Sequence, residues 1–179
     1  MRLVFSIIAL VILTSGVLGQ TRANPQPSPT PNPETLDWCN AEVAYDVMLR
    51  DPQWKHANAL YQIMRAVKSR VTPEQRANMQ TILVAMADGP RKPDLELLNT
   101  VTDDFAEGVS LRRLTAKQKA GLAINMQSAM HGVNDDYMPN VSTSLAFISN
   151  TFNDAGMNTK RARKIVDDVY ALVAKARAG

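Results

Sequence analysis

Apolar residues recur at intervals of three and four positions through most of this chain, a spacing typical of amphipathic α-helices rather than strands. Seven such stripes follow one another from residue 36 to residue 173. They predict an all-α fold of about seven helices. The stripes are Leu36, Cys39, Val43 and Val47; Trp54, Ala57, Leu60, Tyr61, Met64 and Val67; Met79, Ile82, Leu83 and Met86; Leu95, Leu98, Val101, Phe105 and Val109; Leu122, Met126, Ala129 and Met130; Val141, Leu145, Ile148 and Phe152; and Ile165, Val166, Val169, Leu172 and Val173.

Polar residues, prolines and glycines mark where these helices begin and end. Thr72–Gln75 and Thr115–Gln118 have the pattern of a capping box. In this motif the threonine oxygen accepts the third residue's N–H, and the glutamine side chain accepts the threonine N–H. Proline suits a first helical turn and glycine suits the position after a last turn. We therefore expect helix starts at Pro52, Pro93 and Pro139, and helix ends at Gly89, Gly132 and Gly156.

Three of the expected helix starts are evenly spaced. Val71-Thr72, Leu114-Thr115 and Met157-Asn158 lie 43 residues apart, twice over. A period in the low forties is typical of stacked two-helix repeats, whereas a plain helical bundle is the alternative interpretation. The repeat interpretation predicts an opening helix followed by three helical hairpins, over roughly 52–88, 93–131 and 138–177.

The N-terminal segment has the layout of a secretory signal peptide. Arg2 precedes an apolar run over Leu3–Leu13, and the small residues Thr14–Gly16 follow. The run is too short for a bilayer span, which needs roughly 20 apolar residues. We interpret residues 1–23 as a cleaved signal peptide, with an uncleaved membrane anchor as the alternative.

A proline-rich segment follows, with proline at every second position from Pro25 to Pro33. Such a segment favours polyproline II, and ten residues of it span roughly 30 Å. We therefore assign residues 24–34 to a semi-rigid linker. Residues 35–179 have the usual length of a single domain.

Charge gives no support for a nucleic-acid partner. The chain has 20 basic and 17 acidic residues, a formal charge of +3. Cleavage after Ala23 removes Arg2 and Arg22, which leaves the mature chain close to neutral. A basic isoelectric point of the whole chain is therefore no evidence for a polyanionic ligand.

The chain has one cysteine, Cys39, so an intramolecular disulfide is impossible. In an exported protein a single cysteine either pairs between chains or is shielded from solvent. Its place on the first apolar stripe favours a buried thiol. An intermolecular disulfide is the alternative.

No catalytic, cofactor-binding or metal-ligating residue is assigned. Neither His56 nor His131 lies near a nucleophile in a known motif, so both are interpreted as solvated helix residues. Met126, Met130 and His131 could together suit Cu(I), but the two methionines lie on a core stripe. Asp103-Asp104 and Asn134–Asp136 lack the ligand alternation of a calcium loop and are interpreted as surface and turn residues.

Four basic residues gather at the start of the last expected helix, at Lys160, Arg161, Arg163 and Lys164. Cations at a helix N-terminus oppose the macrodipole, which favours a functional role such as contact with an anionic surface. The alternative is that acidic residues four positions later, Asp167 and Asp168, neutralise Arg163 and Lys164.

The two capping boxes also carry a resemblance. Leu114–Gln118 reads Leu-Thr-Ala-Lys-Gln, and Val71–Gln75 reads Val-Thr-Pro-Glu-Gln. They resemble the Leu-Thr-x-x-Gln motif of small periplasmic helical chaperones. The resemblance implies a chaperone that holds apolar segments on an exposed surface lined by methionine and leucine.

We expect an exported protein, periplasmic or extracellular, that acts by binding a protein or peptide without catalysis. Membrane contact is expected only through the N-terminal segment, if it stays uncleaved. One alternative is a chaperone of the Leu-Thr-x-x-Gln type. The other is a helical enzyme, which would need Arg, Lys, Glu and Gln side chains to converge in one pocket with perturbed pKa values.

Export can be tested directly. Mass spectrometry of the mature protein should find an N-terminus near Gln20 or Asn24, because small residues precede both positions. Recovery of chains that keep Met1 in a soluble cytosolic fraction would contradict the prediction.

Overall fold

A computed structural model describes residues 44–135 and 139–179. About 77% of these residues are helical and none of them forms a strand, which confirms the all-α prediction. The expected signal peptide, the linker and Cys39 lie outside the described residues.

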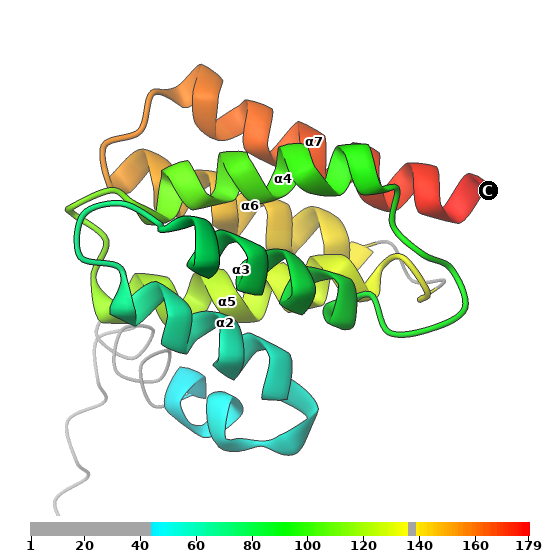
Figure 1. The fold of residues 1–179 in the computed structure, drawn as a ribbon, viewed down its shortest axis with the longest axis horizontal. Helices are drawn as coiled ribbons and strands as arrows, with labels where there is room; N and C mark the ends of the chain where they lie inside the picture. Colours follow the sequence, from blue (N-terminus) through cyan, green and yellow to red (C-terminus); the bar gives the residue numbers. More distant parts are fainter. Residues whose placement is uncertain (1–43, 136–138) are drawn as a thin grey trace, which may run out of the picture. The chain divides into compact units, whose positions relative to one another are not determined.

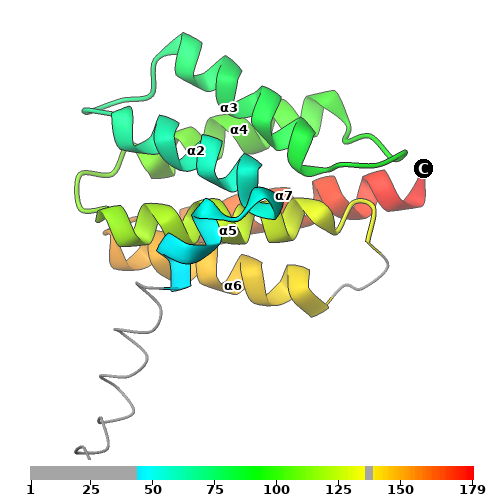
Figure 2. The same ribbon diagram turned by 90° about the horizontal axis from the view of Figure 1, so that it is seen from below.

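The described helices run lengthwise, side by side (Figures 1 and 2). Helix α4 packs on α3 and α7, whereas α5 packs on α2, α6, α3 and α7. Residues 44–50 are also helical and lead into the first element. The elements are η1 (Pro52–Trp54), α2 (Lys55–Ala66), α3 (Pro73–Met86), α4 (Leu95–Val109), α5 (Ala116–His131), α6 (Pro139–Asp154) and α7 (Thr159–Ala178).

The described helices do not form three stacked hairpins. Helices α2 and α3 pack together, as do α6 and α7, but the close packing partners of α4 and α5 are other helices. The expected hairpin over 93–131 is therefore wrong. The bundle interpretation fits, with α4 and α5 joining different neighbours in the same core.

The predicted caps are present at α3, α5 and α7. Thr72 Oγ1 accepts the N–H of Gln75 at 3.2 Å, and Thr115 Oγ1 accepts that of Gln118 at 3.1 Å. Both glutamines return the bond to the threonine N–H, so both capping boxes are complete. Asn158 caps α7 through the N–H of Lys160. Capping chemistry thus accounts for the threonine and glutamine that the first two of these starts share.

Helix α5 is buried around its whole circumference, not along one stripe. Its residues 120–124 are all buried. Five successive residues cover more than one full turn, so no side of this part of the helix faces solvent. The expected stripe, from Leu122 to Met130, is correct but is only one part of the buried surface.

Two stripe positions are exposed instead of buried. Val47 is 62% exposed, since the helix over residues 44–50 buries Leu49 instead. Leu95 is 69% exposed. At that turn of α4, Leu97 packs against the core and Asp94 pairs with Lys175 of α7.

The three expected helix ends fall where predicted, but for different reasons. Gly89 and Gly156 have φ of 144° and 96°, conformations that favour glycine. Gly132 has an ordinary φ of −55°. A Cβ there would lie 2.3 Å from a methyl of Val141, so glycine is needed for the close approach of α6.

In the two described stretches, no helix combines the length and the apolar character needed to cross a bilayer.

The caps can be tested by substitution. Thr72→Ala and Thr115→Ala should each lower the free energy of unfolding by about 0.5–2 kcal/mol, because each leaves a first-turn N–H without its acceptor. Thr72→Ser keeps the oxygen and is the matched control. Chemical denaturation measures the difference. Unchanged stability in both alanine variants would contradict the cap assignment.

Candidate functional site

An open groove of about 490 Å³ lies between the start of α3 and the second half of α4. Its lining mixes apolar and charged side chains from two helices and from the turn before α3. The lining residues are Arg70, Val71, Thr72, Pro73, Arg76, Asp103, Ala106, Glu107 and Ser110.

Local sequence positions both walls of the groove. The capping box at Thr72 starts α3 at Pro73 and directs the first turn along the groove. Ser110, which follows the last residue of α4, joins the two walls. Its Oγ accepts the N–H of Val71 at 3.2 Å and donates to the carbonyl of Ala106 at 2.9 Å. The turn before α3 is thereby tied to the end of α4.

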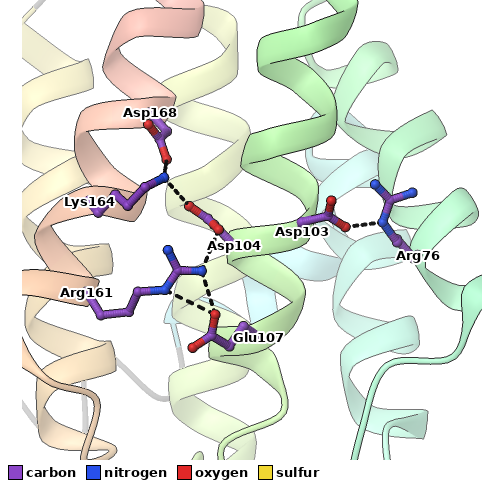
Figure 3. Close-up of polar contacts among 7 residues, drawn as sticks. All are labelled: Arg76, Asp103, Asp104, Glu107, Arg161, Lys164 and Asp168. Atoms are coloured by element: carbon purple, nitrogen blue, oxygen red, sulfur yellow. Dashed lines mark hydrogen bonds and ion pairs between the residues drawn. The ribbon is translucent and has the colours of Figure 1, made fainter.

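An ion pair spans the two helices at the groove. The guanidinium of Arg76 on α3 binds the carboxylate of Asp103 on α4 (Figure 3). The hydrogen bond that Arg76 donates to Asp103 raises the pKa of Arg76 above its ordinary value. Both side chains are partly exposed, so such a pair contributes at most about 1 kcal/mol to stability. Its clearer effect is to fix the positions of two charges in the groove.

The neighbouring face of α4 carries a more buried cluster. Asp104, only 6% exposed, accepts bonds from Arg161 Nη2 at 2.5 Å and Lys164 Nζ at 2.9 Å. Arg161 also pairs with Glu107, and Lys164 pairs with Asp168 at 2.6 Å. The five side chains form one network between α4 and α7 (Figure 3). Glu107 belongs both to this network and to the groove.

The pKa shifts in the network all favour the charged forms. Burial alone raises the pKa of Asp104, but hydrogen bonds from Lys164 and Arg161 outweigh it, and the net pKa is lowered. The pKa of Arg161 is raised, chiefly by Glu107. The pKa of Lys164 is raised by Asp168 and then by Asp104. These groups are therefore set to hold charge, not to exchange protons near neutral pH.

The basic residues at the start of α7 differ in the partners that they bind. Lys164 pairs with Asp168, as the spacing predicts. Arg161 and Lys164 in addition hold Asp104 of α4. Asp104 is therefore not the surface residue that the sequence suggested, whereas Asp103 is exposed as expected. The sequence around an acidic residue in mid-helix does not show that cations 57 and 60 positions further along the chain will pair with it.

The residues considered for copper do not face a common site. Met126 and Met130 are fully buried in the core, and His131 is exposed. The His131 ring lies 3.4 Å from the amide of Gln127. Among the described residues, no three His, Cys, Asp or Glu side chains are grouped to hold a metal ion.

Two features bear on the alternatives to a binding protein. Of the residue types that the enzyme alternative names, arginine and glutamate converge in the groove, as Arg70, Arg76 and Glu107, whereas lysine and glutamine do not line it. The exposed large hydrophobic residues of the described chain do not include methionine, which the chaperone alternative requires. They are Val47, Val84, Leu95 and Tyr170.

Comparison with protein-family models, with curated proteins and with solved structures finds no match to this chain.

The buried network makes a stability prediction. Asp104→Asn should lower the free energy of unfolding at pH 7 by about 1–3 kcal/mol, because it removes a buried acceptor of two charge-assisted bonds. Asp103→Asn, on the neighbouring exposed position, is the matched control and should cost at most about 1 kcal/mol.

The Asp104 effect should depend on pH with a defined sign. The pKa of Asp104 is lower in the folded than in the unfolded chain, so its contribution is present above the unfolded value of about 3.8 and is lost as pH falls below it. The difference between wild type and Asp104→Asn should shrink in denaturation curves recorded below pH 3.8. A difference that grows in acid would contradict the assignment.

Proposed function

We propose that this chain is an exported helical binding protein that holds a segment of a partner polypeptide in the groove between α3 and α4. The observation that carries the proposal is the groove itself, about 490 Å³ in volume and lined by both apolar and charged side chains. Ligand sites combine an apolar lining with a few placed polar groups in this way.

The polar groups of the groove are held in place before any ligand arrives. Asp103 and Arg76 fix each other across the groove, and Ser110 fixes the turn at Val71. Glu107 is held from behind by Arg161. Preorganised groups lose little conformational entropy on binding, which favours specific recognition. Arg70 is exposed and is free to pair with an acidic residue of the ligand.

The electrostatics of the groove favour binding over acid–base catalysis. A catalytic acid or base needs a pKa near the working pH. The pKa of Arg76 moves further from neutral pH, because Asp103 raises a value that is already high. Glu107 is paired with Arg161. The charged residues of the groove therefore suit recognition of an opposite charge.

A comparison of bait variants tests the proposal. Arg70→Glu reverses the exposed cation of the groove, and Arg50→Glu makes the same change outside it. Wild-type protein and Arg50→Glu should retain a common polypeptide from exported proteins of the native source. Arg70→Glu should retain at least tenfold less of it, as quantified by mass spectrometry.

The thermal midpoints of the three proteins serve as the folding control and should agree within a few degrees. Equal retention by all three baits would contradict a groove site. Chemical conversion of the retained polypeptide by wild type, lost in Arg70→Glu, would instead favour the enzyme alternative.

A further inference from the structure

Unpaired positive charge is concentrated at one end of the bundle. Three turns meet there: residues 67–72 between α2 and α3, residues 110–115 between α4 and α5, and residues 155–158 between α6 and α7. Both ribbon views place these turns together, on the left (Figures 1 and 2). We call this region the basic end. Its cations are Lys68 and Arg70 in the first turn, Arg112 and Arg113 in the second, and Lys160 and Arg163 in the first two turns of α7.

Contacts between the elements confirm that the basic end is one surface. The N–H of Val71 bonds to Ser110, which joins the first turn to the second. The Arg113 guanidinium lies beside Gly156, so the second turn adjoins the third. Arg161 at the start of α7 pairs with Glu107 near the end of α4.

These cations have no acidic partners within the described chain. Arg161 and Lys164 are neutralised by Asp104, Glu107 and Asp168, but no described carboxylate lies within ion-pair distance of the six named cations. The turns 67–72 and 110–115 contain no acidic residue at all. The arrangement is costly in isolation, since like charges gathered in one place repel one another.

The opposite end of the bundle differs. The turn between α3 and α4 mixes both signs, with Asp88 and Asp94 beside Arg91 and Lys92. Asp94 there is neutralised by Lys175 at 2.8 Å. A chain that is nearly neutral after the expected cleavage thus gathers six cations at one end.

The described chain also begins near the basic end. Tyr45 packs edge to face on Phe147 at 6.3 Å, and a small pocket groups Tyr45 and Asp46 with Lys117 and Ala120, in the first turns of α5. The 43 residues that precede Ala44 therefore join the domain close to this end. Their sequence includes the apolar run Leu3–Leu13 and the proline-rich linker.

We propose that the basic end docks on a membrane surface of anionic lipid headgroups. Charge complementarity accounts for the six cations. In the alternative in which the N-terminal segment stays uncleaved, its apolar run would also hold the domain close to a bilayer. The exposed large hydrophobic residues of the described chain, such as Leu95 at the opposite end, do not cluster at the basic end. The contact is therefore electrostatic, without insertion of side chains into the acyl region. Each cation near such a surface strengthens binding by about fivefold.

The test is flotation of the full chain with vesicles. One set contains 30% phosphatidylglycerol in phosphatidylcholine, and the other contains phosphatidylcholine alone. The measured quantity is the ratio of the two partition coefficients, in which any contribution from the apolar N-terminal run largely cancels. Wild type should favour the anionic vesicles, and the preference should fall steeply between 50 and 500 mM NaCl.

Two triple variants with equal net charge provide the comparison. Lys68→Gln, Arg112→Gln and Lys160→Gln together remove half of the basic end and spare Arg70 of the groove. Arg50→Gln, Lys55→Gln and Lys92→Gln remove three cations elsewhere. The first variant should lose roughly a hundredfold of the anionic preference, and the second should lose less than fivefold.

Three outcomes would overturn the proposal. The first is equal loss in both triple variants, which would mean that only net charge matters. The second is no anionic preference in wild type. The third is that soluble polyglutamate binds wild type at 100 mM NaCl while the anionic vesicles do not, which would assign the basic end to an acidic polypeptide. None of these depends on the groove, because Arg70 is unchanged in both variants.

Discussion

The whole arrangement depends on the burial of α5. Residues 120–124 leave no solvent-facing side, so helices must cover α5 on every side. Such contact requires small residues where neighbours approach closely. At Gly121 a Cβ would lie 2.6 Å from the ring of Phe147, and at Gly132 it would meet Val141. A helix that is enclosed in this way fixes the positions of its neighbours, because interiors are packed at nearly crystalline density.

Helix α5 also stabilises both ends of α2. The residue before α2, Trp54, provides no side-chain cap. Instead, the amide oxygen of the buried Gln127 accepts the N–H of Ala57 at 2.7 Å, and its nitrogen donates to the carbonyl of Gln53. At the other end Lys119 Nζ donates to the carbonyl of Met64 at 2.8 Å. Burial lowers the pKa of Lys119, but the bond places its charge where the helix dipole favours a cation.

Helix α4 is not among the close neighbours of α5. Ion pairs, as well as packing, hold α4 in place. Phe105 packs edge to face on Phe152, and a Cβ at Gly108 would lie 2.5 Å from the Phe152 ring. On its two flanks, Asp103 binds α3 and Asp104 binds α7. With the Glu107–Arg161 pair, these pairs occupy the carboxylates in the second half of α4, and the cations of the neighbouring turns are left without partners. The groove and the basic end are thus two consequences of where one helix places its carboxylates.

The sequence alone determined the local features of this protein. Periodicity identified the helices from α2 to α7, and the capping boxes at Thr72 and Thr115 located two helix starts, because both signals act within one or two turns. The pair Lys164–Asp168 was predicted for the same reason.

Only the tertiary structure decided which helices are neighbours, and with them the candidate site. Asp104 meets Lys164 across 60 positions of sequence, and Gln127 caps a helix 70 positions away. Neither pairing leaves a periodic signal. The basic end was hidden for a related reason: net charge sums over the chain, whereas a surface depends on which turns the fold brings together. Long-range contacts follow from the enclosure of α5, a property that no single helix encodes by itself.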